Sequence, residues 1–241
     1  MNKIKNISCV VDEVRSQGFS IIPNFWDDKK CSDGRSEIDK IISKYPAAIS
    51  KNSSDNRIFA IEHFSEIFKD EFINKDYVNE IMKSLYSSKT IYGTLLGQRV
   101  EGTPGNSGSG GSWHRDSLKK QFKAFLFISD VDDKSGPFQF FPKSNYFLNK
   151  FIACLSRGGR WNNLDYANEN ELTRAKIDIS SQFSVTCQEG TLLVADTSTI
   201  HRGKPGLEKD RYSVTYYSFK HDIPDHINEI VNRNKKIASA F

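Results

Sequence analysis

A histidine and a carboxylate stand one residue apart in the segment Trp113-His114-Arg115-Asp116, which follows a run rich in glycine and serine. In an extended chain alternate side chains point to the same side, so His114 and Asp116 can reach one point. A second imidazole would complete a metal site, and His201 is its natural source. Two histidines and one carboxylate leave three positions of an octahedron open, which is the ligand set of non-haem Fe(II) sites.

A bare His-x-Asp pair arises by chance in a chain with five histidines, so its context matters. Ten residues beyond His201, Arg211 opens a stretch of β-branched and aromatic residues, 211–219, that predicts a strand. Arg211 and Ser213 share one face of that strand. A guanidinium fork beside a hydroxyl is well matched to a carboxylate that enters the same cavity.

The elements that would position these residues are mostly strands. Alternating or continuous apolar residues predict strands at 19–22, 58–61, 90–100, 122–131, 138–141, 183–187, 191–195 and 212–219. Helical spacing predicts a short helix before Gly18, helices at 37–45 and 76–86, and a closing helix beyond Pro224. The segment 51–57 is polar and is predicted as a loop.

Composition excludes several classes of protein. The 241 residues are 37% hydrophobic and 12% aromatic, as in globular proteins, and no apolar run approaches the roughly 20 residues that span a bilayer. The net charge of +4 is too diffuse to indicate nucleic-acid binding. The four cysteines lack metal or disulfide spacing, and no apolar segment follows the first residues, so we expect a cytoplasmic protein without a secretory signal.

The order of these motifs resembles the phytanoyl-CoA dioxygenase-like branch of the Fe(II)/2-oxoglutarate-dependent oxygenases. The resemblance covers most of the chain. It rests on segments 17–25, 113–116, 128–132, 136–144 and 190–193, on Asp196 before His201, and on Arg211-x-Ser213.

The resemblance implies a mainly β fold with flanking helices (α+β) around a double-stranded β-helix, which is a jelly-roll, cupin-like core. It implies a single domain over 1–241, with a helical lead-in at about 1–88. The least family-like stretch, about 146–178, is expected to be an insertion that carries substrate specificity, because loops on a rigid scaffold can vary without unfolding it.

The resemblance also implies the chemistry. His114, Asp116 and His201 would hold Fe(II), 2-oxoglutarate would fill two further positions, and one would remain for O2. Arg211, supported by Ser213, would bind the distal carboxylate of 2-oxoglutarate. The expected reaction hydroxylates a small polar metabolite and releases succinate and CO2. Asp116 favours it over halogenation, because related halogenases carry a small residue there.

Further residues are weaker candidates for binding. Gln98, Lys123 and Phe125 are expected near the cofactor, although a solvent-facing amide, a snorkelling lysine and a core phenylalanine are the plain alternatives. The other candidates lie in the insertion and suit an acidic or sugar-like small molecule, unless they are ordinary exposed residues. They are Arg157, Arg160 and Trp161.

Two other functions fit part of this pattern. A metal-dependent, cupin-like isomerase or lyase would need the metal ligands but not Arg211. A non-catalytic binding domain would bind ligands without releasing succinate. Substrate identity and oligomeric state are not encoded in any motif we find.

Overall fold

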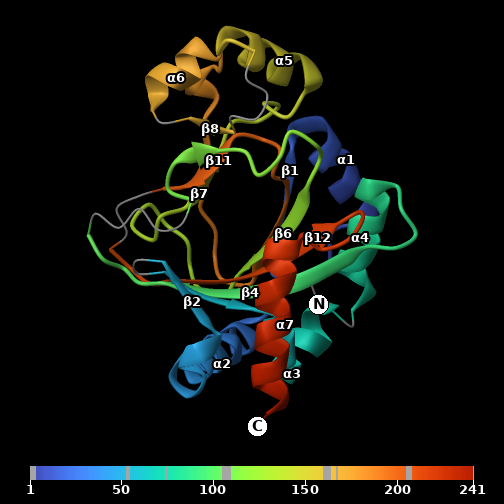
Figure 1. Cartoon of the computed structure of the whole chain (residues 1–241), viewed down its shortest axis with the longest axis vertical. Helices are drawn as coiled ribbons and strands as arrows, with labels where there is room; N and C mark the ends of the chain where they lie inside the picture. The colour runs from blue at the N-terminus through green and yellow to red at the C-terminus, as the bar shows by residue number, and fades with distance from the viewer. Residues whose placement is uncertain are drawn as a thin grey trace.

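Two antiparallel sheets face each other in the computed structural model, which describes residues 4–52, 55–73, 75–104, 110–159, 164–166, 168–204 and 208–240 (Figure 1). The major sheet has the order β1 (Phe19–Ile22), β10 (Thr191–Asp196), β6 (Phe122–Phe127), β12 (Arg211–Phe219), β4 (Tyr92–Val100), β3 (Asp55–Phe59), β2 (Ile49–Asn52). The minor sheet has the order β8 (Asp165–Tyr166), β5 (Trp113–His114), β11 (His201–Gly203), β7 (Phe138–Phe140), β9 (Phe183–Val185). This arrangement is the predicted one, mainly β with flanking helices.

The central strands of the major sheet separate a packing face from a cavity face. Successive side chains of a strand point to opposite faces. On β6 and β12, Ala124, Leu126 and Val214 belong to the large core under the helices. Their sequence neighbours Lys123 and Ser213 point to the opposite face, toward the minor sheet, and line a cavity. The polar site is therefore built on the same strands that hold the core.

Helices cover the outer face of the major sheet. They are α1 (Ile7–Gln17), α2 (Asp28–Lys44), the short α3 (Glu66–Phe68) and α4 (Asp76–Tyr86), whose apolar residues join the large core. The Asn6 side chain caps α1 by accepting from the Ser8 N–H, and Gly18 ends it in the left-handed region at φ 98°. The closing helix α7 (Asp225–Ser239) packs on β3 and β4 beside the cavity.

The segment 51–57 was predicted as a loop, and this is wrong. It belongs largely to the hairpin β2–β3, which extends the major sheet because Arg57 pairs with Gln98 of β4. The strand predicted at 58–61 ends at Phe59, since Ala60 adopts a left-handed conformation at φ 57° and a 3-10 turn (Ile61–His63) follows. Pairing with a distant strand decides this region, and polar residues do not prevent it.

The region 146–178 contains two helices that the sequence did not predict. They are α5 (Phe147–Ser156) and α6 (Glu169–Arg174), and Figure 1 shows them grouped beyond the β8 edge of the minor sheet. α5 leaves Phe147, Leu148 and Leu155 largely exposed. Among the described residues, no helix combines the length and apolar character needed to cross a membrane.

The turn at Gly190 is closely packed against two other segments of the backbone. Gly190 donates its N–H to the Phe127 carbonyl and accepts from the Phe25 N–H at 2.8 Å. It has φ +80°, and a Cβ placed there would lie 2.1 Å from the Trp26 carbonyl oxygen. A side chain here would therefore add a backbone clash to left-handed strain.

We expect Gly190→Ala to destabilise the fold by about 3 kcal/mol or more, as strain and overpacking add. Gly158→Ala is the matched control, because Gly158 also has positive φ but a Cβ there meets nothing within 4 Å. It should cost about 1 kcal/mol from strain alone. Urea unfolding of both variants measures the difference, and equal losses would contradict the clash.

Candidate metal centre

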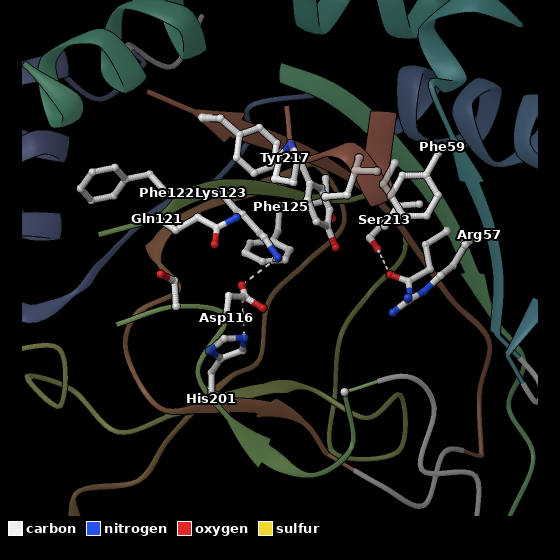
Figure 2. A pocket seen from close by; sticks show the side chains of 18 of the residues that line it. Arg57, Phe59, Asp116, Gln121, Phe122, Lys123, Phe125, His201, Ser213 and Tyr217 are labelled. Carbon is white, nitrogen blue, oxygen red and sulfur yellow. Dashed lines mark hydrogen bonds and ion pairs between the residues drawn. The ribbon is translucent and has the colours of Figure 1, made fainter. Parts of the chain in front are cut away.

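Three potential metal ligands converge between the two sheets. His114 ends β5, Asp116 follows it two residues later, and His201 begins β11. One ligand atom from each lies within 4.8 Å of the others. The two histidines are direct cross-strand partners, and their ring centroids are 4.4 Å apart. Figure 2 shows Asp116 and His201 facing each other at the floor of the cavity.

Backbone carbonyls fix the proton on both imidazoles. His114 Nδ1 lies 2.8 Å from the Ser112 carbonyl, and His201 Nδ1 lies 2.8 Å from the Thr199 carbonyl. A carbonyl oxygen can only accept, so each neutral ring carries its proton on Nδ1 and keeps a lone pair on Nε2. Each Nε2 is 3.8 Å from an oxygen of Asp116. A hydrogen bond from the other ring nitrogen to a backbone carbonyl is typical of metal-binding histidines.

Burial keeps His201 neutral. The side chain is 5% exposed, and this burial lowers its pKa to about 4. Phe138 stacks on the His201 ring with centroids 5.1 Å apart, which restricts the ring further. The site thus presents the Nε2 atoms of two imidazoles and a carboxylate to one point. Such a set of acceptors repels itself unless a cation lies among them.

Lys123 of β6 supplies one neighbouring cation. Its Nζ lies 2.8 Å from Asp116 Oδ2 and 4.0 Å from the ring centroid of Tyr217 (Figure 2). Burial acts to raise the pKa of Asp116, but the charge of Lys123, the neighbouring His201 and hydrogen bonds from Lys123 and Thr197 together outweigh it and hold that pKa well below its ordinary value. Asp116 is therefore a carboxylate whose Oδ1 remains available to a metal.

The other end of the cavity holds the predicted anchor for a carboxylate. Arg211 and Ser213 line this end. A Cβ added to Gly203 would lie 3.8 Å from Arg211 Nη2. Gly203 and His201 are on the same face of β11, so Arg211 is on the side of the sheet where His201 lies. The Ser213 hydroxyl donates to Gln98 Oε1 at 3.4 Å. Burial lowers the pKa of Arg211, although a guanidinium stays charged at neutral pH.

A buried carboxylate that the sequence reasoning missed lies behind this anchor. Asp55 is 0% exposed and accepts hydrogen bonds from Gln98 Nε2 at 2.8 Å and Arg57 Nε at 3.0 Å. Its charge also favours the charged form of Arg211. Gln98 is thus engaged with the protein at both ends of its amide. The available signal was Asp55 and Arg57 one residue apart, and it fell in the segment that was predicted as a loop.

The remaining candidates fall in different places. Lys123 and Phe125 line the cavity, and Phe125 packs against Phe138 with ring centroids 5.1 Å apart. Arg157 does not line it, because its guanidinium lies over the Tyr166 ring and pairs with Glu171. Arg160 and Trp161 lie outside the described residues. A role of the insertion in specificity therefore stays a prediction.

Two buried cations brace the loops that carry the ligands. Arg115, between two of the candidate ligands in sequence, is 3% exposed and donates through Nη1 to the Ser144 and Ser198 carbonyls. Lys150 of α5 donates to the Leu118 carbonyl and to Ser198 Oγ, both at 2.8 Å. Ser198 thus links the two segments that carry the candidate ligands.

Comparison with solved structures shows which fold this is. The epimerase SnoN, solved with Fe3+, α-ketoglutarate and nogalamycin RO, matches with a TM-score of 0.64 at 12% identity over 88% of this chain and 83% of its own. HygX from Streptomyces hygroscopicus, solved with nickel and 2-oxoglutarate, matches with a TM-score of 0.60 at 16% identity over 87% and 85%. AviO1 from Streptomyces viridochromogenes Tue57 gives 0.60 at 12% identity over 91% and 97%.

The chain shares the fold of SnoN, a non-haem α-ketoglutarate-dependent epimerase, and of HygX. The predicted fold class, a jelly-roll core with flanking helices, is confirmed. Identities of 12–16% carry the likeness no further than the fold. No family model and no curated protein matches the sequence, so membership of the phytanoyl-CoA dioxygenase-like branch stays a prediction.

The Lys150 brace has a pH signature. Burial lowers the pKa of Lys150 from 10.5 to about 8. Between these values the unfolded chain binds the proton that the native protein has released, so this residue makes stability increase as pH rises. Relative to Lys150→Met, the wild-type protein should gain stability from pH 7.5 to 9.5. Denaturant unfolding of both proteins at the two pH values tests this, and an unchanged difference would refute it.

Proposed function

We propose that the protein is a non-haem Fe(II)- and 2-oxoglutarate-dependent dioxygenase that hydroxylates a small molecule and releases succinate and CO2. One observation carries this proposal. The two Nε2 lone pairs of His114 and His201 converge on Asp116, and both rings are locked into the ligand tautomer. Two imidazoles and a carboxylate suit Fe(II) and leave positions for a chelating keto acid and O2.

Arg211 and Ser213 are assigned to the distal carboxylate of 2-oxoglutarate. Arg211 forms no ion pair with a carboxylate among the described residues, so its fork can accept one from a ligand. The Arg211 guanidinium lies beside Gly203. Gly203 follows His201 by two residues on β11, so the two positions are roughly 7 Å apart along the strand. Such a span suits a five-carbon dicarboxylate that also reaches the metal. The likeness to HygX, solved with 2-oxoglutarate, supports this assignment.

Bound iron and 2-oxoglutarate would supply the oxidant that cleaves a substrate C–H bond with O2. The chain's residues hold and shield this centre. Lys123 keeps Asp116 charged and occupies its Oδ2, while Phe125 and Phe138 cover the space beside His201 and exclude water. The substrate would enter from the open part of the cavity, beyond Tyr217.

Inversion of a carbon centre is the second candidate reaction, and the likeness to the epimerase SnoN favours it. The two reactions differ in their products, because hydroxylation adds one oxygen atom to the substrate and inversion leaves its composition unchanged. Mass spectrometry of the product separates them. A cupin-like isomerase or lyase would differ from both by turning over without 2-oxoglutarate.

Asp116→Ala should lose Fe(II) binding and 2-oxoglutarate decarboxylation, because the site loses its charged ligand. Asp222→Ala is the matched control, since Asp222 also lines the cavity but is exposed and is not part of the cluster of His114, Asp116 and His201. Metal content after anaerobic loading and succinate release measure the two effects. Near-normal iron retention in Asp116→Ala, with circular dichroism of a native fold, would reject the site.

Arg211→Ala should raise the 2-oxoglutarate concentration needed for half-maximal succinate release about 30-fold or more, since a buried charged partner contributes about 2 kcal/mol or more. Arg211→Lys should show a smaller loss, as it keeps the charge without the fork. Fe(II) affinity in the absence of 2-oxoglutarate should stay unchanged in both variants. An unaltered requirement in Arg211→Ala would mean that another residue anchors the keto acid.

A further inference from the structure

The cavity is larger than the proposed cofactors need. Its volume is about 1080 Å³, slightly above the range of roughly 300–1,000 Å³ for ligand pockets. The part between Asp116 and Arg211 is assigned to iron and 2-oxoglutarate. The remaining space extends toward α7, where an apolar wall is formed by Phe59, Leu96, Phe219, Ile227 and Ile230. A substrate with an apolar body fits against this wall.

Three lysines stand together at the edge of that space. Lys123 of β6 pairs in register with Tyr217 of β12. Because these strands are antiparallel, the residues three before Lys123 and three after Tyr217 leave the sheet at the same end. These residues are Lys120 and Lys220, and Lys119 adjoins them. All three lysines line the cavity and are exposed.

We call these three lysines the basic rim (Lys119, Lys120, Lys220). Ten lysines away from the cavity form ion pairs with carboxylates, namely Lys5, Lys29, Lys30, Lys40, Lys69, Lys75, Lys83, Lys134, Lys204 and Lys209. Within the described part of the chain, no carboxylate pairs with a lysine of the basic rim. Asp222 is the one described carboxylate besides Asp116 that lines the cavity, so the rim carries excess positive charge.

Unpaired cations at the edge of a concave, partly apolar site attract anions and concentrate them there. We propose that the substrate is an organic anion whose phosphate or carboxylate group is bound by the basic rim, while its apolar body lies against the wall beside α7. Lys120 lies three positions before Lys123, which touches Asp116. The anionic group would thus stand roughly 10 Å from the reacting carbon. This assignment rests on the proposed function, since it names the substrate class of the same cavity.

The test uses three probes of similar shape: phenyl phosphate, 4-phenylbutyrate and the neutral 4-phenylbutyramide. Calorimetric titrations are made with metal-free protein and with protein that holds Mn2+ and saturating 2-oxoglutarate, so that Arg211 is occupied. The triple variant Lys119→Gln/Lys120→Gln/Lys220→Gln removes the basic rim. The control triple variant changes the paired surface lysines Lys29, Lys69 and Lys83 to Gln and alters net charge equally.

At least one of the two anions should bind the wild-type protein, and removing the basic rim should weaken it at least tenfold. The control variant should lose less than twofold, and the neutral amide should bind weakly to all three proteins. The stronger anion identifies phosphate or carboxylate as the preferred group. Equal losses in the two variants, an amide that binds as tightly as the anions, or no anion binding would overturn the proposal. Failure of Mn2+ or 2-oxoglutarate to bind would refute the proposed function alone, because the metal-free titrations do not depend on it.

Discussion

Cross-strand pairing of His114 with His201 places two imidazoles on the same face of the minor sheet, 4.4 Å apart. A register slip of one residue would turn one ring to the opposite face and separate the pair. β5 is only two residues long, so its own ladder cannot hold this register. Arg115 and Lys150 supply the missing constraint, because both bind the 196–200 segment through Ser198. The candidate metal centre depends on these buried cations as much as on its ligands.

The major sheet serves stability and chemistry with alternate residues of the same strands. Every second side chain of β6 and β12 packs under the helices, which fixes the backbone and hence the direction of the others. That packing therefore also fixes the positions of the cavity-lining residues Lys123, Ser213 and Tyr217. A cavity of this kind can vary in its polar lining while its walls stay in place, because the core on the far face is unaffected.

The sequence predicted what depends on short-range pattern. The helix 76–86 followed from its apolar spacing, and the approach of His114 to Asp116 followed from the alternation of an extended chain. Asp55 and Arg57 were missed because their strand exists only through pairing with β4. Likewise, residues 119–120 and 220 are brought together by the register of β6 and β12, which a single sequence does not reveal.

The carbonyl contacts of the two imidazoles determine which neighbouring positions can change in sequence. Each ring is oriented by a main-chain oxygen two residues earlier, at Ser112 and Thr199, rather than by a side chain. Those two positions can therefore accept other residues that keep the local backbone, and the tautomers will persist. A protein built in this way can exchange nearly all of the sequence around two histidines and one aspartate and still hold the three candidate ligands in the same geometry.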